Sequence, residues 1–263
     1  MTMMLTIILP FFNEKGWIGP TVASLAAQSD DRFRVLLVDN GSTDGGADEG
    51  ASHAAALEGR FEILSCPTPG KINAMQAGLA LVETPLVTIC DADTLYPPDY
   101  VNRIITLFES DDQAAAVMAI DLYKPQADPC SQQRIAFIMR KSRRFPRKCH
   151  AGGYAQAFRT AALRTAGGFD TKIWPYVLED HEIIHRVIHH GHILHHPLHI
   201  CFPSERRISR KNVSWNGLER LIYRYMPQWG MNWYFYSFLG RRLAARNSLG
   251  IALREKQWCS AAK

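Results

Sequence analysis

The sequence lacks the long apolar run that a membrane-spanning helix needs. None of its 263 residues belongs to an uninterrupted apolar stretch of the roughly 18 to 20 positions that cross a bilayer. Residues 1–10 also lack the basic start and the small-residue cleavage site of a secretory signal. We therefore expect neither a spanning segment nor secretion.

Cysteine is sparse and unpaired in its spacing. The six cysteines form no C-x-x-C pair, which argues against a zinc ribbon and against a disulfide framework and fits a reducing cytosol. Hydrophobic residues make up 47% and charged residues 21% of the chain, which excludes a disordered, collagen-like or coiled-coil protein. The length suits one large domain, or one domain with an appendage.

Charge is distributed unevenly along the chain. Residues 1–130 hold 7 Lys and Arg against 18 Asp and Glu, whereas residues 131–263 hold 23 against 7. This asymmetry predicts a cation on one side of the protein and an anion or an anionic surface on the other.

The first half alternates short β-branched runs with stretches of helical periodicity. The runs predict buried strands at 5–9, 35–38, 61–64 and 86–90, and the periodic stretches predict helices at 18–28, 43–57 and 72–81. Strict alternation predicts a mostly parallel sheet flanked by helices, with ligands at the carboxyl ends of its strands. In the less regular second half we expect a strand at 152–158 and helices at 160–166 and 178–190.

Polar segments follow all four predicted strands, at 10–14, 39–44, 69–73 and 91–93. Each alone is explained by turn or capping chemistry, but together they converge on one sheet edge. Asp91 and Asp93 lie at i and i+2 after a buried strand, so extended backbone points both carboxylates to the same side. Such a pair suits Mg²⁺ or Mn²⁺ bridged to a nucleoside diphosphate. The alternative is a solvated acidic loop.

Six motifs in order carry a specific resemblance: "ILPFFNE", "LLVDNGSTDG", "PGKINAMQAGL", "VTICDADT", "GGFD" and "LEDHEIIHR". From Leu5 to about Arg186 the chain resembles the inverting glycosyltransferases of family 2, which have the GT-A fold. The resemblance implies an enzyme that moves a sugar from a nucleotide-diphosphate sugar, with UDP-sugar as the expected donor, to a hydroxyl group. Two positions depart from the pattern: Phe12 stands where tyrosine is common, and Asn40 stands where a second aspartate often occurs.

The resemblance also implies roles for individual residues. Asp39 would accept a hydrogen bond from the nucleobase, and Asp180 would be the general base. Asp91 and Asp93 would meet ribose, metal and diphosphate, and Lys71 would lie near the donor phosphates or ribose. The other expected donor contacts are the nucleoside pocket residues Pro10, Phe11 and Glu14 and, on the basic loop 204–211, Arg206 and Arg207.

A competing pattern overlaps the last motif. His181, Glu182 and His185 match the H-E-x-x-H signature of zinc proteases, with Glu205 as a conceivable third ligand. Eight of the ten histidines fall between His181 and His199, so a chance match is easy. A further ligand for the aspartate-bound metal among His192, His195, His196 and His199 stays open.

An aromatic and arginine-rich tail ends the chain. We expect residues 1–211 to form the catalytic domain, divided at residue 95 into a nucleotide-sugar half and an acceptor half, and residues 212–263 to form an extension. Aromatic residues beside arginines are typical of an interfacial helix on anionic lipid, which predicts a glycan or lipid-linked acceptor and a peripheral site at the inner face of the cell membrane. A tail packed on its own domain explains the composition equally well. We do not expect nucleic-acid binding, because no recognition module accompanies the basic residues. A non-catalytic binder of nucleotide sugar or lipid remains the alternative to an enzyme.

Overall fold

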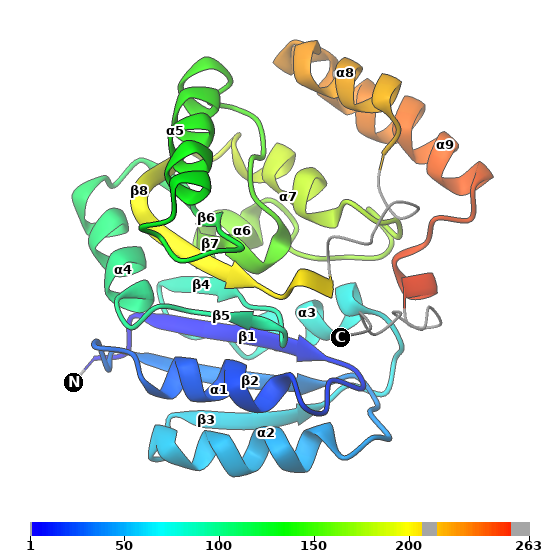
Figure 1. Cartoon of the computed structure of the whole chain (residues 1–263). Helices are drawn as coiled ribbons and strands as arrows, with labels where there is room; N and C mark the ends of the chain where they lie inside the picture. Colours follow the sequence, from blue (N-terminus) through cyan, green and yellow to red (C-terminus); the bar gives the residue numbers. More distant parts are fainter. Residues whose placement is uncertain (1, 207–214, 254–263) are drawn as a thin grey trace.

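The computed structural model describes residues 2–206 and 215–253 (Figure 1). Its centre is an eight-stranded sheet in the order β3-β2-β1-β4-β7-β6-β8-β5. The strands are β1 (Leu5–Phe11), β2 (Phe33–Asp39), β3 (Phe61–Ser65), β4 (Leu86–Ile89), β5 (Thr94–Leu95), β6 (Ala114–Asp121), β7 (Gln156–Arg159) and β8 (His192–Pro203). The α-helices are α1 (Ile18–Ala26), α2 (Gly46–Ala54), α3 (Lys71–Ala80), α4 (Tyr100–Ser110), α5 (Pro129–Arg144), α6 (Thr160–Thr165), α7 (Glu179–Val187), α8 (Gly217–Tyr225) and α9 (Gly240–Ala245).

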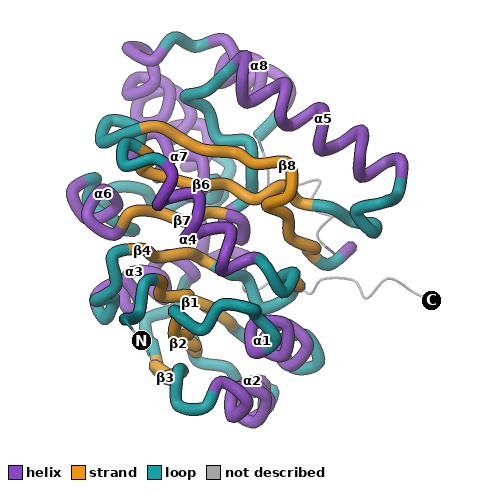
Figure 2. The backbone as a smooth tube through the Cα atoms, turned by 90° about the vertical axis from the view of Figure 1, so that its left-hand side faces the viewer, coloured by secondary structure: helices purple, strands orange, loops and turns teal. Residues whose placement is uncertain are grey.

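The N-terminal half confirms the predicted parallel arrangement. Strands β3, β2, β1 and β4 are all parallel, with Phe11 of β1 opposite Asp39 of β2 and Asp39 opposite Ser65 of β3. Helices α1 and α2 lie on one side of these strands and α3 lies on the other (Figure 2). The carboxyl ends of the strands therefore meet at one edge, where the predicted polar segments emerge.

Two predicted elements begin later than their sequence suggested. Helix α2 starts at Gly46, because Asp39 and Asp44 accept hydrogen bonds from the backbone N–H groups of Ser42 and Gly46 and hold this segment as a turn. The strand expected at 152–158 opens as a 3₁₀ turn, Gly153–Ala155, and only Gln156–Arg159 pairs as β7. Strand β7 is antiparallel to both β4 and β6, so the sheet is mixed beyond β4.

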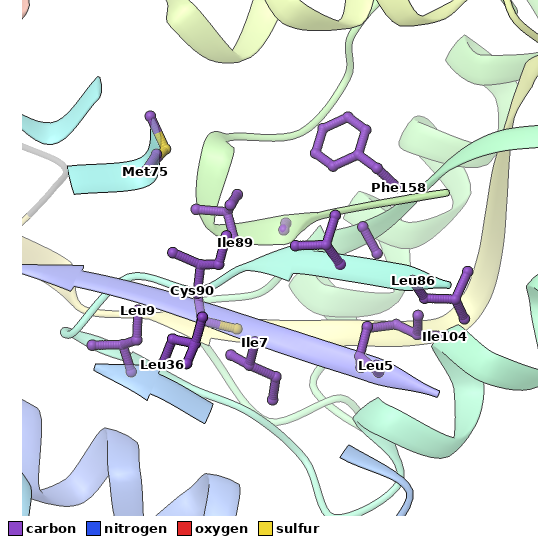
Figure 3. Packing of buried hydrophobic residues seen from close by; sticks show 14 of the residues in the cluster. Leu5, Ile7, Leu9, Leu36, Met75, Leu86, Ile89, Cys90, Ile104 and Phe158 are labelled. Atoms are coloured by element: carbon purple, nitrogen blue, oxygen red, sulfur yellow. The ribbon is translucent and has the colours of Figure 1, made fainter. Parts of the chain in front are cut away.

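The main hydrophobic core fills the space between the sheet and its helices. Strand β1 is buried along its whole length, and Leu5, Ile7 and Leu9 pack with residues of β2, β4 and α4 (Figure 3). Burial on both faces explains why the parallel strands read as continuous apolar runs rather than as alternating ones.

A second, smaller core joins the C-terminal segment to the rest of the protein. Trp174 and Val177, which precede α7, pack with Tyr223, Phe235 and other side chains of residues 215–243. The packed-tail interpretation is thus correct for this face of the segment. The domain boundary expected at residue 211 falls outside the described residues and stays a prediction. Within residues 2–206 and 215–253, no helix combines the length and the apolar character needed to cross a membrane.

Candidate active site

The loops after β1 and β2 are tied together by backbone–side-chain hydrogen bonds. Asn13, at a positive φ of 52°, accepts from the N–H of Thr43, and its own N–H donates to Ser42. Asp39 is half-buried at the end of β2 and accepts from Ser42 N at 2.8 Å. The predicted nucleobase acceptor is therefore held in a fixed turn beside the loop that carries Glu14.

The neighbouring Asn40 has a structural role. Its amide Nδ2 donates to the carbonyls of Cys66 and Thr68, and its Oδ1 accepts from Gly70 N at 2.7 Å. Gly70 has a φ of 122°, a conformation that glycine adopts at little steric cost, and it precedes Lys71 at the start of α3. Asn40 thus positions Lys71, which explains how an amide serves where the family often has aspartate.

Lys71 and Asp91 form one ion pair of the site. The Lys71 ammonium lies 2.7 Å from Asp91 Oδ1 and 3.9 Å from Glu179 Oε1. Because Asp91 is only 6% exposed, water solvates its carboxylate poorly, and the ammonium of Lys71 balances that charge at short range. Burial raises the pKa of Glu179, although Lys71 counteracts that rise.

Asp93 forms a second ion pair, with Arg206. Strand β5 pairs with the end of β8 and brings Ser204 and Arg206 to Asp93, whose Oδ2 accepts from Ser204 Oγ at 3.0 Å and from Arg206 Nε at 2.8 Å. Arg206 also donates to Glu14, and its guanidinium lies 4.8 Å from the ring centroid of Trp17. Arg206, Asp93 and Glu14, which are far apart in sequence, are therefore brought together in the fold.

Asp180 lies in the first turn of α7, behind a strained residue. Leu178, the N-cap, has a φ of 67°, a conformation that costs a non-glycine residue roughly 1–3 kcal/mol. Asp180 Oδ1 accepts from His181, both from its backbone N–H and from its ring Nδ1, each at 2.9 Å. Burial raises the pKa of Asp180, but His181 and Lys71 outweigh it and hold the pKa below its ordinary value. Asp180 is therefore ionised at neutral pH.

A short turn connects the general-base candidate to the two ion pairs. The buried Tyr96 hydroxyl accepts from Asp91 N and donates to the carbonyl of Tyr154, each at 3.1 Å. A Cβ placed on Gly153 would lie 3.6 Å from Asp180 Cβ and 3.7 Å from Lys71 Nζ. Gly153 thus lies next to both the predicted base and the predicted phosphate contact.

Two of the remaining residues predicted to contact the donor lie in the buried strand β1. Pro10 and Phe11 are buried in β1, and the Phe11 ring, 4% exposed, belongs to the main core. Core packing therefore accounts for that ring, and the exposed aromatic side chain beside Glu14 is Trp17, at 44%. Arg207 lies outside the described residues.

The zinc-protease interpretation finds no support, because every side chain of the motif has another partner. His181 binds Asp180, Glu182 pairs with Arg186 and with Tyr236, and both ring nitrogens of His185 bond to side chains of the C-terminal segment. The later histidines have contacts of their own elsewhere in the fold. His192 bonds to Asp111, His196 accepts from Leu198 N, the His195 ring lies 5.6 Å from His150, and His199 stacks on Tyr100.

Asp91 and Asp93 fit a divalent cation as a partial ligand set. Their carboxylates are hard oxygen donors, and no third His, Cys, Asp or Glu joins them into a metal cluster among residues 2–206 and 215–253. Such a pair suits a cation that takes its other ligands from water and from substrate phosphates.

Sequence reasoning missed three contributors to the site. The Trp17 ring packs against the Arg206 guanidinium. Tyr96 links Asp91 to the turn before β7. Gly153 has no side chain that would crowd Asp180. The aromatic directly after "FFNEKG" and the glycine pair before Tyr154 were the available signals.

Parallel strands that end at a carboxylate-rich edge, with a partly buried carboxylate on a helix facing that edge, are typical of the GT-A fold. Comparison with known proteins agrees. The model of glycosyl transferase family 2 matches residues 6–167, and the chain belongs to that family.

Solved structures share the fold over most of the chain. The mannosyltransferase PcManGT from Pyrobaculum calidifontis, in complex with GDP-Man and Mn²⁺, superposes with a TM-score of 0.64 at 18% identity, covering 96% of this chain and 78% of that one. S. aureus TarS 1–349 in complex with UDP-GlcNAc gives 0.59 at 16% identity, covering 97% and 76%.

Sequence relatives match over shorter segments. An undecaprenyl-phosphate 4-deoxy-4-formamido-L-arabinose transferase from Aeromonas hydrophila is 29% identical over 107 residues, 39% of this chain and 32% of that protein. The first of the curated relatives is matched over 37% of its length, so the chain spans little more than a third of such proteins.

Proposed function

We propose that the protein is an inverting, metal-dependent glycosyltransferase that moves a sugar from a nucleotide-diphosphate sugar to a hydroxyl of a glycan or glycolipid. One observation carries the proposal. An ionised carboxylate, Asp180, stands across Gly153 from the cation Lys71, which is itself paired with Asp91. Base, donor-phosphate contact and metal ligand are thereby adjacent.

Donor binding would exchange ion pairs. Lys71 and Arg206 are paired with carboxylates in this structure, and their charges suit the donor diphosphate. Asp91 and Asp93 would hold Mg²⁺ or Mn²⁺, which supplies positive charge to the departing diphosphate. Asp39 would accept the N–H of the base, and Glu14 would line the nucleoside side of the pocket.

The chemical step needs one proton acceptor. As the acceptor oxygen forms its bond to the anomeric carbon, its proton passes to Asp180 and the bond to the nucleoside diphosphate breaks on the opposite face, which inverts the anomeric centre. His181 fixes the Asp180 carboxylate through its two hydrogen bonds. Lys71 and Arg206 offset charge growing on the leaving group. A non-catalytic relative would bind donor but release no nucleoside diphosphate.

Calorimetry with nucleotides tests donor and metal together. UDP should bind much more tightly with Mn²⁺ than with EDTA, and Asp93→Ala should abolish that difference. GDP is the necessary comparison, since one structural neighbour was solved with GDP-Man and the other with UDP-GlcNAc. Equal UDP affinity with and without metal in the unaltered protein would refute metal dependence.

The acceptor is proposed to lie at an anionic membrane surface. Leu218, Leu221 and Tyr225 on α8 are more than half exposed, as are Trp229 at 87% and Trp233 at 52%. These apolar side chains lie on the segment that also carries exposed Arg220, Arg224 and Arg241, a composition suited to a headgroup layer. The neighbouring Arg242 and Arg246 instead bind the buried Glu219.

Liposome flotation tests the membrane proposal. The protein should float with vesicles that contain anionic lipid but not with neutral ones, and high salt should release it. Replacing both Trp229 and Trp233 by alanine should abolish flotation, whereas Ile63→Ala, which removes an exposed apolar side chain from β3, should not. An intact protein that ignores anionic vesicles at low salt would point to a soluble acceptor.

A further inference from the structure

A basic pocket lies beside the candidate active site, and its lining includes His181, the neighbour of Asp180. It has a volume of about 370 Å³ and is enclosed by α5, α8 and the segment 148–154. Four of its lining side chains are the cations Lys141, Lys148, Arg220 and Arg224, and the aromatic side chains include Trp215 and Tyr223.

The four cations are not neutralised by acidic side chains. Among residues 2–206 and 215–253, no ion pair joins any of them to a carboxylate, and the one acidic residue that lines the pocket, Asp121, is paired with Arg134. Lys148 is 7% exposed and donates to the Met226 carbonyl at 2.8 Å, a neutral partner. Of the four cations Lys148 is the buried one, and a buried charge is costly unless a group of opposite charge joins it.

Lys141 lies close to other positive charges. Burial lowers its pKa, and the nearby charges of Arg224, Arg134 and Arg220 lower it further. Because these neighbours repel Lys141, the residue costs stability in the empty pocket. A residue that costs stability and has no internal partner is typical of a ligand site.

A polar atom in the pocket wall also lacks a partner. His150 is 9% exposed, and its Nε2 bonds to the Phe145 carbonyl at 2.9 Å, so Nε2 donates and Nδ1 is left with a lone pair. No protein group among the described residues bonds to Nδ1. Because Nδ1 is itself buried, it does not by itself identify a ligand group, and the inference rests on the cations.

The wall of the pocket contacts the proposed catalytic base directly. His181, which binds Asp180, lines the pocket, and its ring lies against those of Trp215 and Tyr223 at centroid distances of 4.6 and 5.4 Å. Gly152 also lines it, next to Gly153 at the Asp180 side chain. A molecule with its anionic end in the pocket can extend a hydroxyl toward Asp180.

We propose that this pocket binds a phosphoryl or diphosphoryl group of the acceptor, close to the sugar whose hydroxyl is glycosylated. The inference rests on the proposed glycosyl transfer and deepens it by assigning the acceptor class: a phosphate-bearing glycan or a lipid-linked sugar phosphate. The geometry distinguishes this subsite from the donor site, whose cations Lys71 and Arg206 are already paired with Asp91 and Asp93.

Titration of inorganic pyrophosphate into the full-length protein tests the pocket without the proposed catalytic reaction. The experiment is run in EDTA, so that metal-assisted binding at the donor site does not contribute. Replacing both Lys141 and Arg224 by glutamine should weaken pyrophosphate binding by at least about tenfold, since two charge-assisted contacts are lost. The matched control replaces both Arg140 and Arg143, which are exposed on α5 and outside the pocket, by glutamine. It removes the same charge and should leave the affinity within about threefold.

Two further measurements separate a binding role from a structural one. Lys141→Gln should leave the melting temperature unchanged or raise it, because it removes like-charge repulsion; a fall would indicate a structural lysine and overturn the assignment. Lys71→Ala should retain pyrophosphate binding. If Lys71→Ala abolishes binding while the Lys141 and Arg224 variant retains it, the anion occupies the donor site and the proposal is wrong.

Competition with two phosphate esters identifies the source of the anion. Displacement of pyrophosphate mainly by glucose 1-phosphate supports a water-soluble phosphorylated glycan, and displacement mainly by monomeric dodecyl phosphate supports a lipid-linked one. Failure of both esters to compete overturns the phosphorylated-acceptor assignment. UDP with Mn²⁺ should bind the Lys141 and Arg224 variant as it binds the unaltered protein. If the unaltered protein does not bind UDP with Mn²⁺, the proposed function is contradicted, whereas the pyrophosphate measurements on the pocket still stand.

Discussion

Arg206 offers a test in which metal and nucleotide affinity should change in opposite directions. Its guanidinium lies 2.8 Å from Asp93 Oδ2, and the two side chains are 18% and 2% exposed. In this arrangement Arg206 competes with a cation for Asp93. In the proposed function, the same guanidinium would bind the phosphate oxygens of the donor diphosphate. Arg206→Gln should therefore strengthen binding of Mn²⁺ alone and weaken binding of UDP with Mn²⁺.

The size of the effect follows from the distance and the burial. Two unit charges 2.8 Å apart attract by about 1.5 kcal/mol in water and about 6 kcal/mol at an effective dielectric constant near 20. Desolvation of both ions offsets part of this attraction, so a net effect of roughly 1.5–3 kcal/mol, as for a hydrogen bond to a charged group, is reasonable. The two dissociation constants should each change by roughly 10- to 150-fold.

Isothermal titration of Mn²⁺, and of UDP in the presence of Mn²⁺, measures both constants on one sample. Arg34→Gln is the matched control, because Arg34 forms a 2.6 Å ion pair with the half-exposed Glu62 on the neighbouring strands β2 and β3 and is not part of the site. The reasoning fails if Arg206→Gln shifts both affinities in the same direction, or shifts neither.

Three other changes test separate parts of the structure. Asp180→Asn should lower turnover by about 10² to 10⁴, the usual contribution of a general base, with donor affinity nearly unchanged in calorimetry; near-native turnover would place the base elsewhere. Burial lowers the pKa of Lys148 to about 8, below its ordinary 10.5, so the unfolded state holds more protons between those values and denaturant stability should rise with pH there. Lys148→Met should lack that rise. If the variant and the unaltered protein have the same pH profile of stability, the rise does not come from Lys148. Glu219→Ala removes a buried carboxylate that is bound by the partly exposed Arg242 and Arg246, and it should cost roughly 1.5–3 kcal/mol in denaturant unfolding. Leu221→Ala on the exposed face of α8 should cost little.

The parallel half of the fold was predictable because local pattern and tertiary burial agree there. Strand β1 is apolar from Leu5 to Phe11 and is buried throughout, so its sequence carries the signal of a central strand. The polar residues after each strand then converge by topology alone, which is why Asp91 and Lys71 could be placed together before their contact at 2.7 Å was known.

The other contacts depend on pairing between distant segments, which no local pattern records. Arg206 reaches Asp93 because the two-residue strand β5 pairs with the end of β8, and a strand so short has no sequence signal. A motif also does not tell which of its apolar residues is buried. The Phe11 ring packs in the core, and the exposed aromatic side chain near Glu14 is Trp17.

The uneven charge of the chain is explained differently on its two sides. At the carboxyl edge of the parallel strands, Asp91 and Asp93 are paired with Lys71 and Arg206, and in the proposed function a donor and a metal would take over those contacts. In the basic half, the cations around Lys141 and Arg224 have no carboxylate partner among the described residues, so that side keeps its charge. A donor diphosphate must displace existing ion pairs, whereas an acceptor phosphate would meet cations that have none. On this reasoning the acceptor pocket should retain affinity for anions when metal is removed, and the donor site should lose it.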